Sequence, residues 1–261
     1  MCGERGPTAS WVMRARTLRI EEAPGATGAV VVVDVVRAFT AAACALAAGA
    51  SELVLVETVE EAFRLRDALP GSLLMGEAMG KPIRGFDLGN SPAEVSSVDL
   101  AGRRLIHRTS NGTRGIARCV HAAPLLAGTF VCAGATARWL SERGLESPQL
   151  VITGIYPGSD GDEDLAFADY LDALLAADGP VTAEPFLHRV RDCVHGSRML
   201  ESEDPELRED LRLCMDLDRF PFALPVSRKE GLLVLSAELP AGPEPAPPGR
   251  EAGRGGRPRL P

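Results

Sequence analysis

Short runs of β-branched residues alternate with Ala- and Leu-rich stretches along the middle of the chain, and this alternation restricts the fold more than any other feature. The run 29–33 is apolar at every position, as expected of a strand that is buried on both faces of a sheet. The stretch 41–48 that follows has the small, apolar side chains of a buried helix. Strands and helices that alternate at this spacing predict an α/β protein in which helices cover both faces of a mostly parallel sheet.

The same two patterns predict the remaining elements. The stretch 59–69 is amphipathic, with Ala62, Leu65 and Leu69 on one face of a helix. Further strands are expected at 53–57, 72–76, 104–107, 125–131, 150–153 and 232–235, and further helices at 113–121, 135–143, 162–177 and within 182–219.

The two ends of the chain differ from this body. Residues 237–261 hold seven prolines and five glycines and almost no apolar side chains, a composition that is typical of disordered segments. We therefore expect a loose N-terminal segment over 1–15, one folded domain over 16–236 and a disordered tail over 237–261.

Charge and cysteine content exclude several classes of function. The 36 acidic and 28 basic residues give a net charge of −8, so nothing draws the chain as a whole to nucleic acid or to an anionic membrane. The six cysteines have no Cys-x-x-Cys spacing, which favours free thiols over a disulfide framework or a zinc ribbon. Asp34 and Arg37 interrupt the most apolar stretch, and residues 1–25 contain no signal peptide. We expect a cytoplasmic protein that binds neither nucleic acid nor membrane, and the sequence leaves open whether it forms a homo-oligomer.

Polar, glycine-containing clusters follow the predicted strands. Ligands of open parallel sheets bind beyond the carboxyl ends of the strands. Because these ends meet at one edge of a parallel sheet, the clusters predict a single binding site there. They lie at 34–37, 77–92, 109–114 and 154–164.

Asp34 and Arg37 follow the most apolar strand, where a carboxylate has little contact with water. Such an acid needs a cationic partner, which could be a bound Mg²⁺ or Arg37 itself. In the second case the two residues form a structural ion pair between strand and helix. An aspartate nucleophile of the haloacid dehalogenase type is disfavoured, because Val36 stands where that motif has its second aspartate.

The longest polar connection begins at Glu77 and has the character of a binding loop. Glu77 and Asp87 could hold a hard cation through their oxygens. Lys81 and Arg84, in the same loop, could bind the anionic groups of a substrate.

The stretch 109–113 opens a predicted helix, and its backbone N–H groups could cradle an anion. Helix capping explains any one of its Ser, Asn and Thr residues equally well, just as a turn explains Asn90-Ser91-Pro92. No nucleotide-binding glycine motif occurs. The candidates for binding the phosphate or the rest of a substrate are Asn90, Ser91, Ser110, Asn111, Gly112 and Thr113.

Glu163 and Asp164 stand at the start of another predicted helix. Acids in the first turn suit the helix dipole, so a structural role competes with a functional one, and both acids stay candidate site residues. The four histidines, at 107, 121, 188 and 195, show no metal-ligand spacing. We expect them on the surface or in the core rather than at a zinc site.

Four of these motifs occur in the order and spacing of a known family. In chain order they are Asp34-Val-Val-Arg37-Ala-Phe-Thr40, Gly76-Glu77, Gly85-Phe-Asp-Leu-Gly-Asn-Ser-Pro92 and Thr109-Ser-Asn-Gly-Thr113. With them the chain resembles the 2-phosphosulfolactate phosphatase (ComB) family over about residues 29–226. Glu163-Asp164 and the stretch 195–200 are similar as well, and the eight-residue motif is the most specific match.

The resemblance implies a three-layer α/β/α fold and a reaction. The reaction is the Mg²⁺-dependent hydrolysis of 2-phosphosulfolactate to 3-sulfolactate and phosphate. By this resemblance Asp34 and Glu77 hold the metal, and Asp87 is a further ligand or a base. Whether water or Asp34 attacks phosphorus stays open.

The implied substrate is a small phosphorylated molecule with several anionic groups. By this resemblance Arg37 and the cradle 110–113 bind the phosphoryl oxygens of the substrate, and Lys81 or Arg84 binds its sulfonate or carboxylate. Phe39 departs from the family's usual Thr and removes a hydroxyl next to the implied metal, so the type of reaction is better supported than the substrate. A related phosphorylated hydroxy acid is an alternative substrate. A non-catalytic sensor of a phosphorylated metabolite, and a lyase or mutase, are alternatives to the hydrolase.

Overall fold

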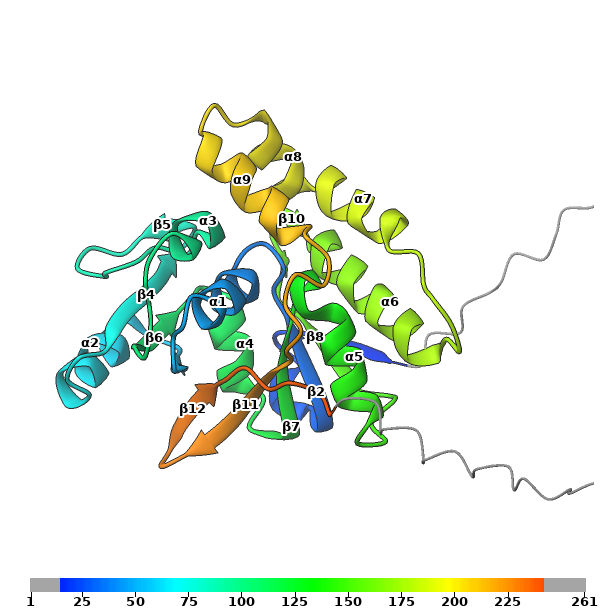
Figure 1. Cartoon of the computed structure of the whole chain (residues 1–261), viewed down its shortest axis with the longest axis horizontal. Helices are drawn as coiled ribbons and strands as arrows, with labels where there is room; N and C mark the ends of the chain where they lie inside the picture. Colours follow the sequence, from blue (N-terminus) through cyan, green and yellow to red (C-terminus); the bar gives the residue numbers. More distant parts are fainter. Residues whose placement is uncertain (1–14, 242–261) are drawn as a thin grey trace, which may run out of the picture.

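The computed structural model describes residues 15–241 and shows a twisted sheet between layers of helices (Figure 1). Within these residues one sheet has ten strands, in the order β1-β8-β2-β7-β11-β12-β3-β6-β4-β5, and β9 pairs with β10 in a separate hairpin. The strands are β1 (Arg16–Arg19), β2 (Thr27–Val33), β3 (Glu52–Val56), β4 (Leu73–Ala78), β5 (Lys81–Pro82), β6 (Arg104–Arg108), β7 (His121–Gly128), β8 (Gln149–Ile152), β9 (Ile155–Tyr156), β10 (Ser159–Asp160), β11 (Leu224–Lys229) and β12 (Leu232–Leu235).

Helices cover both faces of the sheet, which confirms the predicted three-layer α/β/α fold. One face carries α1 (Ala38–Ala47), α3 (Pro92–Ser96) and α4 (Gly112–Arg118). The opposite face carries α2 (Val59–Ala68), α5 (Ala133–Ser141) and α6 (Asp162–Ala176). The helices α7 (Glu184–Asp192), α8 (Val194–Glu201) and α9 (Pro205–Cys214) follow α6 and lie beyond the sheet, where α7 packs on α6 and α9 packs on α3 (Figure 1). Two short 3-10 helices, η1 (Ala23–Gly25) and η2 (Phe130–Cys132), complete the described elements.

Strand β2 is buried on both of its faces, as its apolar run predicted. Val30 and Val32 pack into the core on the side of α1, and Val31 and Val33 pack into the core on the side of α6. All four side chains are fully buried. A strand with both faces covered needs an apolar residue at every position, as the sequence predicted.

The sheet consists of two parallel blocks joined by an antiparallel hairpin. The blocks are β1-β8-β2-β7 and β3-β6-β4, and the hairpin β11–β12 pairs antiparallel with β7 on one side and with β3 on the other. Because of these junctions, the strands of the second block run opposite to those of the first. A twist of about 20–25° from each strand to the next, however, accumulates to roughly 100–125° over the steps from β2 to β6. The carboxyl ends of both blocks therefore approach one another (Figure 1). The sequence predicted one site at a single edge of a parallel sheet. In the structure, the strand ends that could form such a site meet where the two blocks approach each other.

The described residues include part of each predicted end segment. Ala15 is buried and donates its N–H to Oδ1 of Asp172 at 2.9 Å. Glu238, inside the predicted tail, exchanges backbone hydrogen bonds of 2.8 and 3.0 Å with Ala223. The rest of the predicted loose segment and disordered tail, 1–14 and 242–261, lies outside the described residues.

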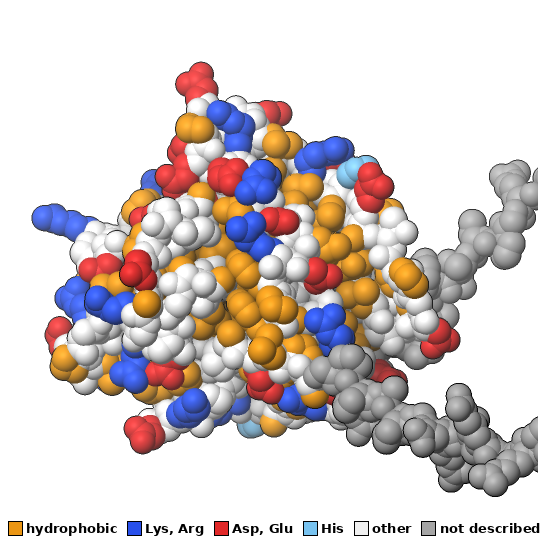
Figure 2. Space-filling model, viewed as in Figure 1, with side chains coloured by type: hydrophobic (Ala, Val, Ile, Leu, Met, Phe, Trp, Pro, Cys, Tyr) orange, Lys and Arg blue, Asp and Glu red, His pale blue; other side chains and the backbone are white. Residues whose placement is uncertain are grey.

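The surface carries both signs of charge. On the face in Figure 2, Lys and Arg side chains lie interspersed with Asp and Glu, and apolar side chains gather over the middle. Across residues 15–241, no helix has the length and apolar character needed to cross a membrane. The free thiols in this part of the chain, all buried, are Cys44, Cys119, Cys132, Cys193 and Cys214.

Candidate active site

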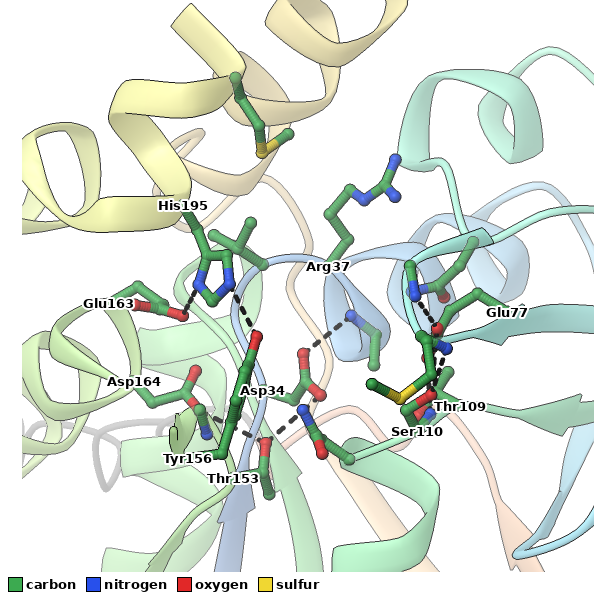
Figure 3. Close-up of a pocket in the computed structure, with 18 of the residues that line it drawn as sticks. Asp34, Arg37, Glu77, Thr109, Ser110, Thr153, Tyr156, Glu163, Asp164 and His195 are labelled. Carbon is green, nitrogen blue, oxygen red and sulfur yellow. Dashed lines mark hydrogen bonds and ion pairs between the residues drawn. The ribbon is translucent and has the colours of Figure 1, made fainter. Parts of the chain in front are cut away.

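A cavity of about 690 Å³ lies between the two blocks of the sheet. The first block contributes Asp34, after β2, and Thr153, after β8, and the second contributes Glu77, near the end of β4 (Figure 3). Helix α8 adds His195 and Arg198. The polar clusters at the strand ends thus come together, as the sequence predicted, although the strands belong to two blocks.

Asp34 follows β2 directly and is 8 % exposed. Its Oδ1 accepts the N–H of Ala38, the first residue of α1, at 3.1 Å, and its Oδ2 accepts the hydroxyl of Thr153 at 3.3 Å. Burial raises the pKa of Asp34 to about 7, and the charges of Glu77 and Glu163 raise it as well. A buried acid among other acids is stabilised by a bound cation.

Arg37 is not the partner of Asp34. Its Nη1 lies 2.6 Å from Oδ2 of Asp210 in α9, and Asp210 is fully buried. The other oxygen of Asp210 accepts the hydroxyl of Ser91 at 2.7 Å and the N–H of Ala93 at 2.9 Å. The hypothesis of a structural Asp34–Arg37 pair is therefore wrong, and Asp210 holds the Arg37 guanidinium at the cavity.

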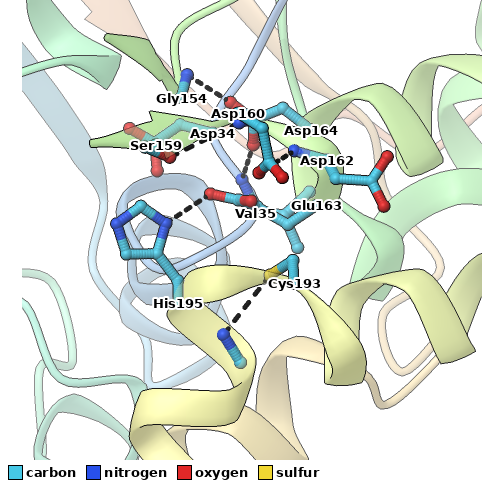
Figure 4. A network of polar contacts seen from close by, with 12 residues as sticks. Asp34, Val35, Gly154, Ser159, Asp160, Asp162, Glu163, Asp164, Cys193 and His195 are labelled. Carbon is cyan, nitrogen blue, oxygen red and sulfur yellow. Dashed lines mark hydrogen bonds and ion pairs between the residues drawn. The ribbon is translucent and has the colours of Figure 1, made fainter. Parts of the chain in front are cut away.

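Asp164 joins the chain segments that leave β2 and β8. Its Oδ1 accepts the N–H of Val35 at 2.9 Å, and its Oδ2 accepts the N–H of Gly154 at 2.8 Å (Figure 4). Burial raises the pKa of Asp164, and the nearby charges of Glu163 and Asp34 add to that rise. Both oxygens of Asp164 are held by backbone donors, so this acid positions the loops around the cavity.

Glu163 begins a chain of hydrogen bonds that ends in the cavity. Its Oε1 lies 2.8 Å from Nδ1 of His195, and Nε2 of His195 lies 2.9 Å from the hydroxyl of Tyr156 (Figures 3 and 4). The Glu163 side chain is 3 % exposed. Its hydrogen bond raises the pKa of His195, which favours the imidazolium form.

Glu77 binds the loop that opens α4. Its Oε1 accepts the N–H of Ser110 at 2.5 Å, and its Oε2 accepts the N–H of Gly80 at 2.6 Å. The N–H of Thr113 donates to Oγ1 of Thr109 at 3.0 Å. The anion cradle expected at 110–113 is therefore partly filled by the protein, because two of its N–H groups already have acceptors.

Some of the predicted site residues line the cavity and others do not. Lys81 and Arg84 are exposed around β5, and Asp87 uses Oδ2 to accept the N–H of Leu74 at 2.8 Å. The lining includes Asp34, Arg37, Glu77, Asn90, Ser110, Asn111, Glu163 and Asp164, whereas Lys81, Arg84, Asp87, Ser91, Gly112 and Thr113 do not belong to it.

Gly112 nevertheless lies against the site. A Cβ at this position would stand 2.9 Å from Oδ2 of Asp34 and 2.8 Å from Cβ of Ala38. The start of α4 can approach Asp34 this closely only because residue 112 has no side chain.

Sequence reasoning did not name Thr153 as a site residue, placed Arg114 and Tyr156 in polar clusters without giving either a role, and treated His195 and Arg198 only as part of a family-like stretch. Thr153 and Tyr156 follow β8, so their position at a strand end was the available signal. His195 was expected on the surface or in the core, and no ligand spacing marked it as a cavity residue. It reaches the cavity through the packing of α8.

Known proteins are similar to this chain over more than half of its length. The family model described as 2-phosphosulpholactate phosphatase matches residues 16–229. A protein of Bacillus subtilis named "Probable 2-phosphosulfolactate phosphatase" is 33% identical over 185 residues, which cover 70% of this chain and 80% of that protein. Proteins with the same name from Carboxydothermus hydrogenoformans (42% identical, covering 57% of this chain and 60% of that protein) and Gloeobacter violaceus (32% identical, covering 80% and 92%) are also similar. The chain therefore belongs to the 2-phosphosulpholactate phosphatase family.

Proposed function

We propose that this chain is a Mg²⁺-dependent phosphatase that hydrolyses 2-phosphosulfolactate to 3-sulfolactate and phosphate, or acts in the same way on a related small phosphorylated hydroxy acid. Family membership supports the reaction class. The observation that carries the proposal is that one cavity gathers Asp34 and Glu77 and also presents Arg37 and Arg198. Acids and arginines together suit a substrate with several anionic groups that binds beside a cation.

A divalent cation fits the acids of the cavity. The charge of Glu77 raises the pKa of Asp34, so a cation between the two would relieve an unfavourable interaction. Within residues 15–241 no group of three His, Cys, Asp or Glu side chains is placed to hold a metal ion. Mg²⁺ is commonly held by one or two carboxylates together with water and substrate phosphate, and we assign the two carboxylates to Asp34 and Glu77. When bound, the ion supplies positive charge to the phosphoryl oxygens.

The chain's own groups orient the substrate in this proposal. Arg37, fixed by Asp210, binds phosphoryl oxygens, and the N–H group of Asn111, which lines the cavity, donates to the same group. Arg198, exposed in α8, makes no ion pair with the described residues. It is therefore free to bind the sulfonate or carboxylate at the other end of the substrate.

Phosphate release tests the proposal. Purified protein is assayed with 2-phosphosulfolactate, 2-phospholactate and phosphoglycolate in Mg²⁺, and again after EDTA. We expect release from at least one substrate, loss of release in EDTA and recovery with added Mg²⁺. Binding without turnover would favour the sensor, and a product without free phosphate would favour a lyase or mutase.

A further inference from the structure

The proposed hydrolysis leaves one cluster of the cavity without a role. Glu163 in α6, His195 in α8 and Tyr156 in β9 form a continuous line of hydrogen bonds, with distances of 2.8 Å and 2.9 Å. All three residues line the same cavity as Asp34 (Figure 3). Since they come from separate elements, this alignment depends on how α6, α8 and the β9–β10 hairpin pack together.

The three residues differ in burial, and this defines the direction in which a proton can move along their hydrogen bonds. Glu163 is almost fully buried and binds Nδ1 of His195, so this nitrogen carries a proton and Nε2 points to Tyr156. A carboxylate that orients an imidazole in this way is the usual support of a histidine that transfers protons. Asp34 also favours the charged imidazole and Arg198 opposes it, and the net effect is a raised pKa of His195.

Tyr156 is the end of the line that a ligand can reach. Its side chain lines the cavity and the residue is 40 % exposed. Burial of its hydroxyl and the charges of Glu163 and Asp34 raise the pKa of the phenol, so the hydroxyl keeps its proton at neutral pH. A protonated phenol backed by an imidazolium can pass a proton on without holding a negative charge.

We infer that Glu163, His195 and Tyr156 form a proton relay that protonates the leaving oxygen of the phosphate ester. The inference rests on the proposed phosphatase function and adds the source of the proton. Tyr156 touches the leaving oxygen, His195 supplies the proton, and Glu163 is a positioning residue that acts through His195.

The step balances in atoms and charge. The bond between phosphorus and the ester oxygen breaks, and its electron pair stays on that oxygen while an oxygen of water becomes bonded to phosphorus. The leaving oxygen takes the proton of the Tyr156 hydroxyl, and this hydroxyl takes the proton on Nε2 of the His195 imidazolium. The attacking water releases a proton to solvent, and neutral His195 regains one from solvent afterwards.

The chemistry of the leaving group favours such a donor. The oxygen of a 2-hydroxy acid leaves as an alkoxide, a strong base, unless it is protonated as the bond breaks. General acid catalysis contributes about 10²–10⁴-fold in such steps. A nitrophenolate is a weak base and leaves without a proton, so an aryl phosphate does not need the relay.

Two substrates therefore separate the relay from every other role of these residues. The variants His195→Gln and Tyr156→Phe are assayed on an alkyl ester, 2-phospholactate or 2-phosphosulfolactate, and on p-nitrophenyl phosphate. We expect both variants to lose about 10²-fold or more in kcat on the alkyl ester and less than about 10-fold on the aryl ester. His188→Gln, an exposed histidine of α7, is the matched control and should match wild type on both.

The aryl substrate also reports on folding, because a variant that hydrolyses it has an intact cavity. Equal losses on both esters would overturn the relay. Wild-type activity of Tyr156→Phe on the alkyl ester would overturn it as well, since His195 would then donate without the phenol. If wild-type protein hydrolyses neither ester, the proposed function itself fails, which is a different result.

Glu163→Gln tests the positioning role through the pH profile. This variant keeps an acceptor for Nδ1 but removes the charge that favours the imidazolium. We expect the alkaline limb of the alkyl-ester profile to move to lower pH, with the aryl-ester profile unchanged. An alkaline limb that stays in place would show that Glu163 does not act through His195.

Discussion

Nη1 of Arg37 lies 2.6 Å from Oδ2 of Asp210, although the two residues are 173 positions apart in the chain. The same buried carboxylate accepts hydrogen bonds from Ser91 and Ala93 at the start of α3. One side chain of α9 thus joins α3 to the loop that follows β2. The position of a cavity arginine and the stability of the fold therefore depend on the same carboxylate.

Asp210→Ala should destabilise the protein and misplace Arg37. Breaking a buried ion pair by removing one partner costs about 3–5 kcal/mol, because the other charge is left without compensation. Asp210→Asn keeps the volume and one acceptor, so we expect a smaller loss of stability but a clear rise in KM. Urea unfolding and steady-state kinetics measure the two effects, with Glu206→Gln, exposed on the same helix, as the control. A normal KM in a folded Asp210→Asn variant would contradict the role given to Arg37.

Asp34→Asn and Glu77→Gln should each lower turnover by about two orders of magnitude or more, as loss of a principal charge stabiliser usually does. We also expect Mg²⁺ to raise the melting temperature of wild-type protein, and both variants to weaken this rise. Asp67→Asn, on the exposed side of α2, is the control for a lost surface carboxylate. Full activity and an unchanged Mg²⁺ response in both folded variants would rule out the metal assignment.

Arg198→Ala should raise KM about 10-fold or more for a substrate with a second anionic group and change KM little for a simple phosphate ester, since charge-assisted hydrogen bonds contribute about 1.5–3 kcal/mol. Lys81→Ala should leave KM for both near wild type, because Lys81 is exposed outside the cavity. If Lys81→Ala raised KM and Arg198→Ala did not, the second anionic group would bind at the loop of Lys81, as the sequence predicted. Steady-state kinetics with the two substrates distinguishes them.

His107, in β6, should make the protein less stable in mild acid. Burial lowers its pKa from 6.5 to about 3. The unfolded chain therefore binds a proton between these pH values and the folded chain does not, so the free energy of unfolding falls as pH falls from about 6.5. The fall is about 1.4 kcal/mol per pH unit inside this window.

The variant His107→Gln removes this contribution. Asp34 and Asp164 have raised pKa values and act in the opposite direction over part of the same window. The comparison is therefore between wild type and variant, by urea unfolding at pH 7 and pH 5. We expect the variant to lose less stability than wild type, and His121→Gln, exposed at the start of β7, to behave as wild type. Parallel pH dependences of wild type and His107→Gln would contradict the prediction.

The elements that could be predicted are those whose burial requires a recognisable pattern of apolar residues in the local sequence. Strand β2 is apolar throughout because both of its faces are covered. Strand β11 was missed because it contains Pro225 and ends in Arg228 and Lys229, which argue against an internal strand. Its place between β7 and β12 is set by tertiary contacts that no local pattern reports.

The same distinction applies to the site. Asp34, Glu77 and Ser110 were predicted because they lie where strands end. Lys81 was predicted from its charge, but the short β4–β5 hairpin leaves it exposed. Arg198 was not predicted as a cavity residue, because it reaches the cavity only once α8 has packed beside the β9–β10 hairpin.

The central position of β11 and β12 has a consequence for synthesis on the ribosome. The two parallel blocks are complete in sequence long before the hairpin that joins them has been translated, and until then β7 and β3 each keep an unpaired edge. A nascent chain that stops short of Leu235 therefore has both sides of the cavity, connected by helices such as α1 and α4, but lacks the two strands that join the blocks into one sheet. Activity should emerge late and abruptly as translation proceeds, when the last strand enters the middle of the sheet.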